Sequence, residues 1–177
     1  MLISKKINDA INQQIGNEFG ASLQYVAIAA HFDSEALPQL AAHFYEQAGE
    51  ERDHAMMMVQ FLLDTDADVT IPGVEAPNTR FADSTEPIAL ALAQERRVSE
   101  QINGLAATAR EHSDFTSEQF IQWFIREQIE EVATMTSLLR VAERSEDDVA
   151  EVEEYVAREH AGGEGEDPTA PGAAGAN

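Results

Sequence analysis

Acidic and amide side chains interrupt several stripes of apolar residues in this chain, and their chemical types suit metal binding. Glu18 occupies one position of a stripe at helical spacing that runs from Ile15 to Tyr25. An ionised carboxylate buried among apolar groups is costly unless a positive charge neutralises it, and a polyvalent cation does so directly. The same kind of interruption recurs at Glu51, His54, Glu95, Gln128 and Glu131. Because the set offers hard oxygens, one imidazole and no thiolate, it favours a pair of iron or manganese ions over copper.

The interruptions repeat at one fixed distance along the chain, which indicates an internal duplication. Three pairs of polar residues are each 77 positions apart: Glu18 and Glu95, Glu51 and Gln128, His54 and Glu131. The chain has 33 acidic residues among 177, so a single such pair would mean little. Three pairs at one offset, all on apolar stripes, indicate that two helix pairs contribute equivalent residues to one site.

The apolar periodicity predicts an all-α chain with four long helices and a short fifth one. We expect these helices at about residues 4–33, 38–63, 86–112, 117–143 and 146–158. Short connections after the first and third helices make each pair an antiparallel hairpin, and Ser84 or Thr85 is expected to cap the third helix. The segment 67–86 has no periodicity and can span up to about 60 Å, whereas a helix of this size is about 40 Å long. It can therefore cross the whole bundle, which leaves the second and third helices parallel.

Composition and charge narrow the possible partners. The formal net charge of −22 argues against nucleic acid and anionic membranes as partners, because both require a basic face. No apolar run has the length of a membrane span or the form of a signal peptide, so we expect a cytoplasmic protein. The absence of cysteine excludes thiolate metal sites. The remaining histidines lack a partner carboxylate on a core stripe and are expected on the surface or in loops: His31, His43, His112 and His160.

These motifs resemble those of bacterial non-haem ferritins, over about residues 1–158. The ferritin-like pattern has one Glu from each of two helices and a Glu-x-x-His from each of the other two. Glu18 and Glu95 resemble the single carboxylates, and Glu51 with His54 forms the first paired motif. The second pair departs from this pattern, because Glu131 stands where the second His would be. The resemblance implies a ferritin-like four-helix bundle with a diiron site in residues 1–160, followed by a flexible acidic Gly/Ala/Pro-rich tail in residues 161–177.

By resemblance, two irons lie within one subunit and share the Glu51 carboxylate. The first iron would take Glu18, Glu51 and His54, and the second Glu51, Glu95 and Glu131, with Gln128 near the second. An additional iron site would lie on the cavity side, at Glu50, Glu127 and Glu130; the alternative is a row of exposed carboxylates. Tyr25 and Trp123 could supply an electron; for Tyr25 the favoured alternative is a core tyrosine bonded to a site carboxylate, which needs no redox role.

The activity implied by this resemblance is oxidation of Fe(II) by O2 or H2O2 and storage of the Fe(III) mineral inside a cage of 24 identical subunits. A second apolar row on the first helix is compatible with a subunit contact: Phe19, Leu23, Val26 and Ala30. No haem is expected, because Arg52 stands where haem-binding relatives carry a methionine. The main alternative is a diiron oxidase or peroxidase of the rubrerythrin type without a storage cavity. A purely structural bundle or a small-cage DNA-protecting protein conflicts with Glu18, Glu51 and Glu95.

Overall fold

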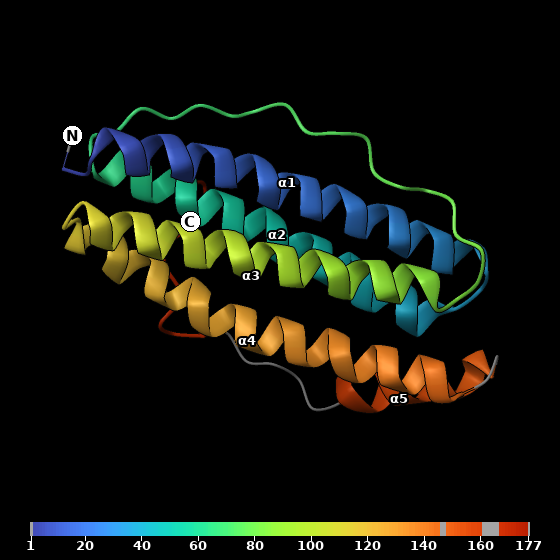
Figure 1. Ribbon diagram of the computed structural model, residues 1–177. Helices are drawn as coiled ribbons and strands as arrows, with labels where there is room; N and C mark the ends of the chain where they lie inside the picture. The colour runs from blue at the N-terminus through green and yellow to red at the C-terminus, as the bar shows by residue number, and fades with distance from the viewer. Residues whose placement is uncertain (1, 146–147, 161–166, 177) are drawn as a thin grey trace.

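The computed structural model describes residues 2–145, 148–160 and 167–176, and in this part of the chain every regular element is a helix. The elements are α1 (Lys5–Ser34), α2 (Pro38–Asp64), α3 (Glu86–Glu111), α4 (Phe115–Arg144) and α5 (Val149–His160). Figure 1 shows α1 and α2 as one antiparallel hairpin and α3 and α4 as another, with the segment 65–85 running along the length of α1. As a result, α2 and α3 are parallel. The predicted four-helix bundle with one long crossover and a short fifth helix is confirmed.

Acidic side chains cap two helices in ways that differ from the sequence prediction. At α4, the Asp114 carboxylate accepts a hydrogen bond from the backbone N–H of Ser117 at 3.0 Å, so the helix begins at Phe115 and not at Ser117. At α3, Thr85 makes no capping bond through its side chain. Instead, the carboxylate of Asp83 accepts the N–H of Glu86 at 2.8 Å. The predicted start of the fifth helix falls on residues 146–147, which lie outside the described residues.

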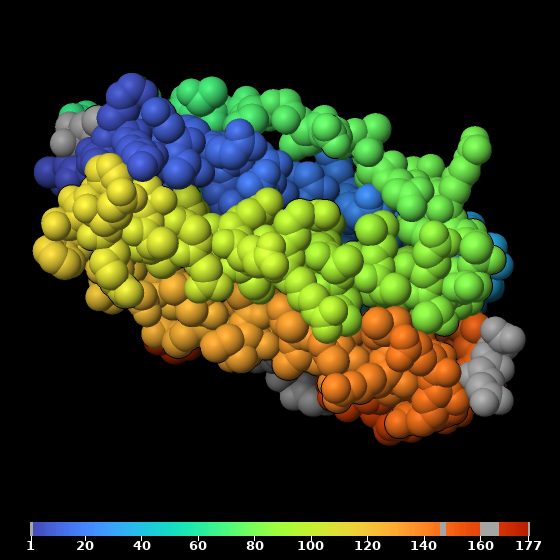
Figure 2. Space-filling model, in the orientation of Figure 1, coloured from blue at the N-terminus to red at the C-terminus, as the bar shows by residue number. Residues whose placement is uncertain are grey.

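The crossover is fastened to α1 by amide side chains. The Nδ2 atoms of Asn8 and Asn12 both donate to the backbone oxygen of Asp68 at 2.8 Å. Further along, the side-chain amide of Gln24 makes two hydrogen bonds with the backbone of Asn78. Its Nε2 donates to the Asn78 oxygen at 2.9 Å, and its Oε1 accepts the Asn78 N–H at 2.8 Å. An irregular segment lacks the regular backbone hydrogen bonds of a helix or strand, so these side chains supply partners for some of its backbone N–H and C=O groups. Figure 2 shows the crossover lying along α1 on the outside of the bundle.

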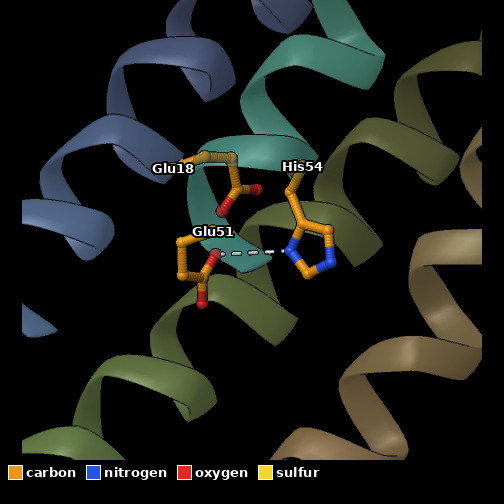
Figure 3. Close-up of side chains that lie close together, drawn as sticks. All are labelled: Glu18, Glu51 and His54. Atoms are coloured by element: carbon orange, nitrogen blue, oxygen red, sulfur yellow. Dashed lines mark hydrogen bonds and ion pairs between the residues drawn. The ribbon is translucent and has the colours of Figure 1, made fainter. Parts of the chain in front are cut away.

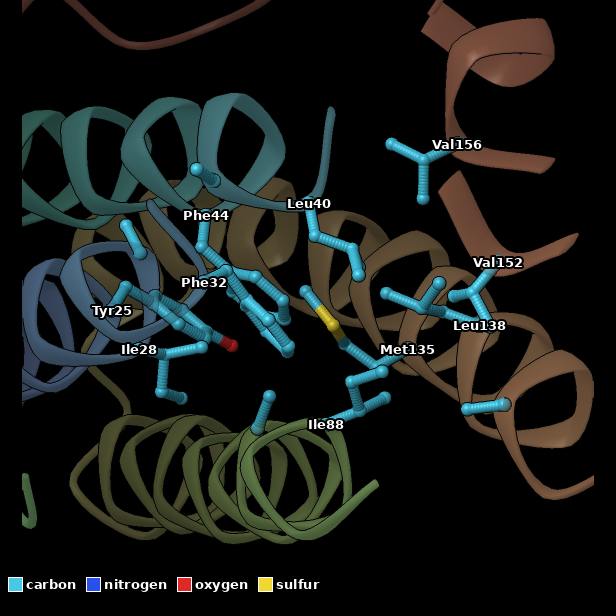
Figure 4. Close-up of a cluster of buried hydrophobic side chains, with 14 of the residues drawn as sticks. Tyr25, Ile28, Phe32, Leu40, Phe44, Ile88, Met135, Leu138, Val152 and Val156 are labelled. Atoms are coloured by element: carbon cyan, nitrogen blue, oxygen red, sulfur yellow. The ribbon is translucent and has the colours of Figure 1, made fainter. Parts of the chain in front are cut away.

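The apolar core is divided into two clusters, and the polar interruptions lie between them. One cluster fills the end of the bundle near α5, where Tyr25, Phe32 and Phe44 pack together (Figure 4). The other fills the opposite end and includes Ile7 and Phe124. The two clusters are separated on every long helix by a short gap, between Ile15 and Tyr25, Ala48 and Ala55, Leu92 and Val98, and Phe124 and Met135. The four gaps form one polar layer across the bundle.

Chain segments after α4 pack back on the bundle. Val152 and Val156 of α5 join the core cluster that contains Leu40. In residues 167–176, the N–H of Ala174 donates to the backbone oxygen of Met56 at 3.0 Å, so this part of the tail contacts α2. Residues 161–166 lie outside the described residues, and the flexibility expected for the tail stays a prediction. Among the described helices, none combines the length and apolar character needed to cross a membrane.

Candidate metal centre

The polar layer brings three predicted ligands from α1 and α2 together (Figure 3). Glu18, Glu51 and His54 each offer one ligand atom, and these atoms all lie within 4.8 Å of one another. The two carboxylates are 1% exposed and the imidazole 5%. Glu51 and His54 are one helical turn apart, so their side chains share a face, and Nδ1 of His54 lies 3.3 Å from Oε2 of Glu51. Such a group has the size and composition of one metal-binding site.

Two oxygens of this group have no hydrogen-bond partner. They are Oε2 of Glu18 and Oε1 of Glu51, both buried. A buried acceptor that has lost its water without gaining a donor costs free energy, and the cost is larger for a charged group. A bound cation would satisfy both oxygens at once. This observation supports a metal in the polar layer more directly than the presence of acidic residues does.

Burial changes the protonation of the three groups in opposite directions. It raises the pKa of Glu18 to about 7, an effect that the contact with Glu51 and, after it, the hydrogen bond from Gln14 partly offset. Burial also raises the pKa of Glu51 well above its ordinary value, and repulsion by the nearby carboxylate of Glu95 adds to this effect. In contrast, burial lowers the pKa of His54 to about 4, because it disfavours the imidazolium. His54 is therefore a neutral imidazole at physiological pH, which is the form that binds metals.

The carboxylate of Glu95 enters the layer from α3 and accepts hydrogen bonds from two neighbours. It is fully buried; the hydroxyl of Tyr25 donates to its Oε1, and Nε2 of Gln128 donates to its Oε2 at 3.2 Å. Ser99 in turn donates to Oε1 of Gln128 at 2.9 Å, which fixes the orientation of that amide. Burial raises the pKa of Glu95, and the hydrogen bond from Tyr25 works against that rise. The predicted residues Tyr25 and Gln128 thus both contact Glu95.

Glu131 lies where the polar layer meets an acidic cavity. The cavity has a volume of about 420 Å³ between α2, α4 and α5, and Glu131 lines it. The three residues proposed for the additional site line the same cavity: Glu50, Glu127 and Glu130. Glu131 is 6% exposed and acts electrostatically on Glu51, whose pKa it helps to raise. The layer and the cavity are therefore adjacent.

His43 contradicts the sequence analysis. It was expected on the surface or in a loop, yet it lies within α2, is 8% exposed and lines the acidic cavity. Its ring packs edge-on against Phe44, with 5.1 Å between ring centroids. The sequence did contain a signal, because Gln47 and Glu50 follow His43 at spacings of four and seven residues and so share its helix face. The helix α5, which covers this face, could not be placed from that spacing. The side chain of His160 lies outside the described residues.

Two further residues near the layer were not singled out from sequence. Gln14, one turn before Glu18, donates from Nε2 to Oε1 of Glu18 at 2.9 Å. Asp167 of the tail accepts a hydrogen bond from the indole N–H of Trp123 at 2.8 Å. The indole packs edge-on against His54, with 5.6 Å between ring centroids. A position one turn from a ligand was a usable signal for Gln14, whereas nothing in the sequence pointed from Asp167 to Trp123.

Comparisons with known proteins agree with this geometry. A family model described as a ferritin-like domain matches residues 8–145. The chain is 53% identical to ferritin BfrB of Mycolicibacterium smegmatis over 173 residues, which cover 98% of this chain and 95% of the relative. It is 32% identical to a bacterial non-heme ferritin of Staphylococcus epidermidis over 83% of this chain and 89% of the relative. Among solved structures, an open-pore ferritin from the hyperthermophilic archaeon Archaeoglobus fulgidus superposes with a TM-score of 0.84 at 27% identity, covering 88% of this chain and 96% of that one.

Proposed function

The chain belongs to the ferritin family and is an iron-storage protein with a ferroxidase site; from that premise, we propose which of its residues hold the iron. Glu18, Glu51 and His54 bind the first Fe(II). The observation that carries this proposal is that one ligand atom from each residue lies within 4.8 Å of the others. In addition, the carboxylates of Glu18 and Glu51 each have a buried oxygen without a hydrogen-bond partner. Iron is the substrate here, since it enters as Fe(II) and is stored as Fe(III).

The second Fe(II) is bound by Glu51, Glu95 and Glu131, with Glu51 shared between the two ions. Support comes from the electrostatics of Glu51, whose pKa is raised by repulsion from Glu95, Glu18 and Glu131 after burial itself. Carboxylates that repel one another across a short distance are stabilised by cations placed between them. Tyr25 and Gln128 hold Glu95 in place through its two oxygens. This role of Tyr25 requires no electron transfer.

The ligand set suits oxidation of iron. Hard carboxylate oxygens bind Fe(III) more strongly than Fe(II), so they favour loss of an electron from each bound ion. Two Fe(II) ions give two electrons, which reduce one O2 to H2O2 with uptake of two protons or one H2O2 to two waters with uptake of two protons. The neutral imidazole of His54 and the deprotonated carboxylates provide the nitrogen and oxygen atoms that bind iron. The buried layer keeps bulk water away while the ions are oxidised.

Oxidised iron leaves through the acidic cavity, where Glu50, Glu127 and Glu130 form an additional iron site. These three residues line the cavity together with Glu131, which the second iron also uses. An ion released by Glu131 therefore meets the further carboxylates that line the cavity. Such a path matches a storage protein, because the mineral must grow away from the site at which iron is oxidised.

Many copies of the chain form the storage cage, for which we propose 24 subunits. Leu23 and Val26 support an interface, because each is more than two-fifths exposed in the single chain, at 42% and 43%. Adjacent exposed apolar side chains on one helix face indicate a protein contact. A diiron oxidase of the rubrerythrin type would need no such assembly.

The decisive experiment compares Glu51→Ala and His54→Ala with the wild type. Fe(II) is added in air to the metal-free protein at two ions per chain, and the ferric absorbance is followed. We expect the initial oxidation rate to fall by at least roughly tenfold in both variants, since loss of a ligand costs at least as much as loss of its supporting partners. Asp53→Ala is the matched control, because Asp53 lies on the same helix with its side chain 57% exposed and should oxidise iron at the wild-type rate. Equal rates in all four proteins would refute the proposed site.

A further inference from the structure

Gln14 is a buried polar residue to which the proposed chemistry gives no part. It lies on α1, is 2% exposed, and uses every polar atom of its amide. Its Nε2 donates to Oε1 of Glu18 at 2.9 Å and to Oε1 of Gln101 at 3.2 Å. Its own Oε1 accepts a hydrogen bond from Nδ2 of Asn17 at 2.9 Å. A buried side chain held at three points has little freedom to move.

These partners determine which way the amide faces. The form of Glu18 that binds a metal is ionised and can only accept hydrogen bonds, and the nitrogen of Gln14 faces it. Asn17 directs its N–H groups at the other end of the amide and therefore keeps the oxygen there. The bond to Gln101 ties the arrangement to α3, which also carries Glu95. Both halves of the bundle thus contribute to the position of one carboxylate.

The consequence for Glu18 is that its two oxygens are not equivalent. Oε1 is occupied by Gln14, whereas Oε2 is buried and has no hydrogen-bond partner. We propose that Gln14 is a positioning residue for the first iron: it retains Oε1 of Glu18 so that the carboxylate binds the metal through Oε2 alone. This inference rests on the proposed iron site. A carboxylate that bound through both oxygens would fill one more coordination position, and a site that reacts with an oxidant must keep a position open.

Metal binding tests the inference without any turnover. The probe is Co(II) under anaerobic conditions, added to metal-free protein while its visible absorption is recorded, because the intensity of this absorption changes with coordination number. Gln14→Leu keeps the bulk of the side chain and removes all its polar atoms. We expect the first Co(II) to bind about 10- to 100-fold more weakly, as is typical when the partner of a metal ligand is removed. We also expect the absorption per bound ion to decrease, since Glu18 becomes free to bind through both oxygens.

Gln13→Leu is the matched control, because Gln13 is the adjacent, exposed residue of the same type. It should bind Co(II) with the affinity and spectrum of the wild type. A second variant, Asn17→Ala, leaves Gln14 in place but releases its amide to rotate, and should change the spectrum in the same direction with a smaller loss of affinity. If Gln14→Leu does not fold, this variant decides alone. Variants whose spectra match that of Gln13→Leu would overturn the inference, even with weakened binding.

The same titration separates this inference from the function on which it rests. Glu51→Ala should lose the first Co(II) site. If Glu51→Ala binds Co(II) like the wild type, the proposed iron site itself is wrong. If Glu51→Ala loses binding while Gln14→Leu and Asn17→Ala retain both affinity and spectrum, the site stands and only the role of Gln14 is refuted.

Discussion

Individual carboxylates in the polar layer release protons when they bind a metal. Burial raises the pKa of Glu18 to about 7 and that of Glu51 well above the ordinary carboxylate value. Near pH 7, Glu18 therefore carries a proton for part of the time in the metal-free protein, and the raised pKa of Glu51 favours its protonated form. A metal ion binds only the deprotonated carboxylates, so its binding must release these protons. His54, with a pKa of about 4, has already lost its proton and releases none.

We therefore predict that Zn(II), as a redox-inert probe, binds more tightly as the pH rises through about 7, the pKa of Glu18. Raising the pH removes the competing proton, and affinity stops increasing once the carboxylates stay deprotonated. Calorimetry in two buffers with different ionisation enthalpies measures the protons released per ion. Glu18→Gln, which cannot titrate, should release fewer. Zn(II) affinity that is constant between about pH 6 and about pH 8 would contradict the prediction.

At the scale of helices, α5 completes the start of α2. The residue before α2, Leu37, makes no side-chain capping bond. Glu153 of α5 supplies the missing acceptors, because its two carboxylate oxygens accept the N–H groups of Gln39 at 3.1 Å and Leu40 at 2.7 Å. A negative charge at a helix N-terminus also interacts favourably with the helix dipole. The Glu153 carboxylate thus links α5 to α2 and provides acceptors for two N–H groups in the first turn of α2.

Replacing Glu153 by Ala should therefore loosen both helices. We expect a loss of about 1 kcal/mol, the usual effect of removing a capping side chain. Hydrogen exchange followed by mass spectrometry should show the amides of Gln39 and Leu40 exchanging roughly fivefold faster. Glu154→Ala is the control, because this neighbouring side chain is 77% exposed. Exchange that is equally slow in both variants would show that Glu153 does not cap α2.

The whole molecule presents an apolar face that a single chain does not cover. Leu23 and Val26 lie on α1 and are exposed. The crossover lies along the same helix (Figure 2). Both side chains are more than two-fifths exposed, at 42% and 43%, and the subunit assembly proposed above would bury them. A charged residue at such a contact would be buried without a partner, which strongly disfavours association.

The double substitution Leu23→Glu and Val26→Glu is accordingly predicted to break the cage into smaller species. Sedimentation velocity measures the outcome: the wild type should sediment as a particle of many 19.4-kDa chains, and the variant as a few chains. Gln13→Glu places one negative charge elsewhere on α1 and should leave the particle intact. An unchanged size distribution in the double variant would place the subunit contact on another face.

Much of the fold and of the polar layer could be predicted from the sequence, because both depend on local periodicity. Residues three or four apart share a helix face whatever the rest of the chain does, so Glu51 and His54 had to point the same way. The repeat of polar residues at 77 positions predicted two equivalent hairpins, and the long segment without periodicity predicted the crossover. These features need no knowledge of how one helix is rotated against another.

Only the tertiary structure decided contacts between side chains that are distant in sequence. Gln14 meets Gln101 across 87 residues, and Glu153 reaches the start of α2 across 114. His43 is buried although the lack of a partner carboxylate on a core stripe predicted a surface or loop position, and Asp167 meets Trp123 from the tail. Each of these depends on the rotation and separation of packed elements, which many weak contacts set together. Periodicity therefore identified the side chains that share a core-facing stripe, and packing determined that Oε2 of Glu18 and Oε1 of Glu51 are the oxygens without a hydrogen-bond partner.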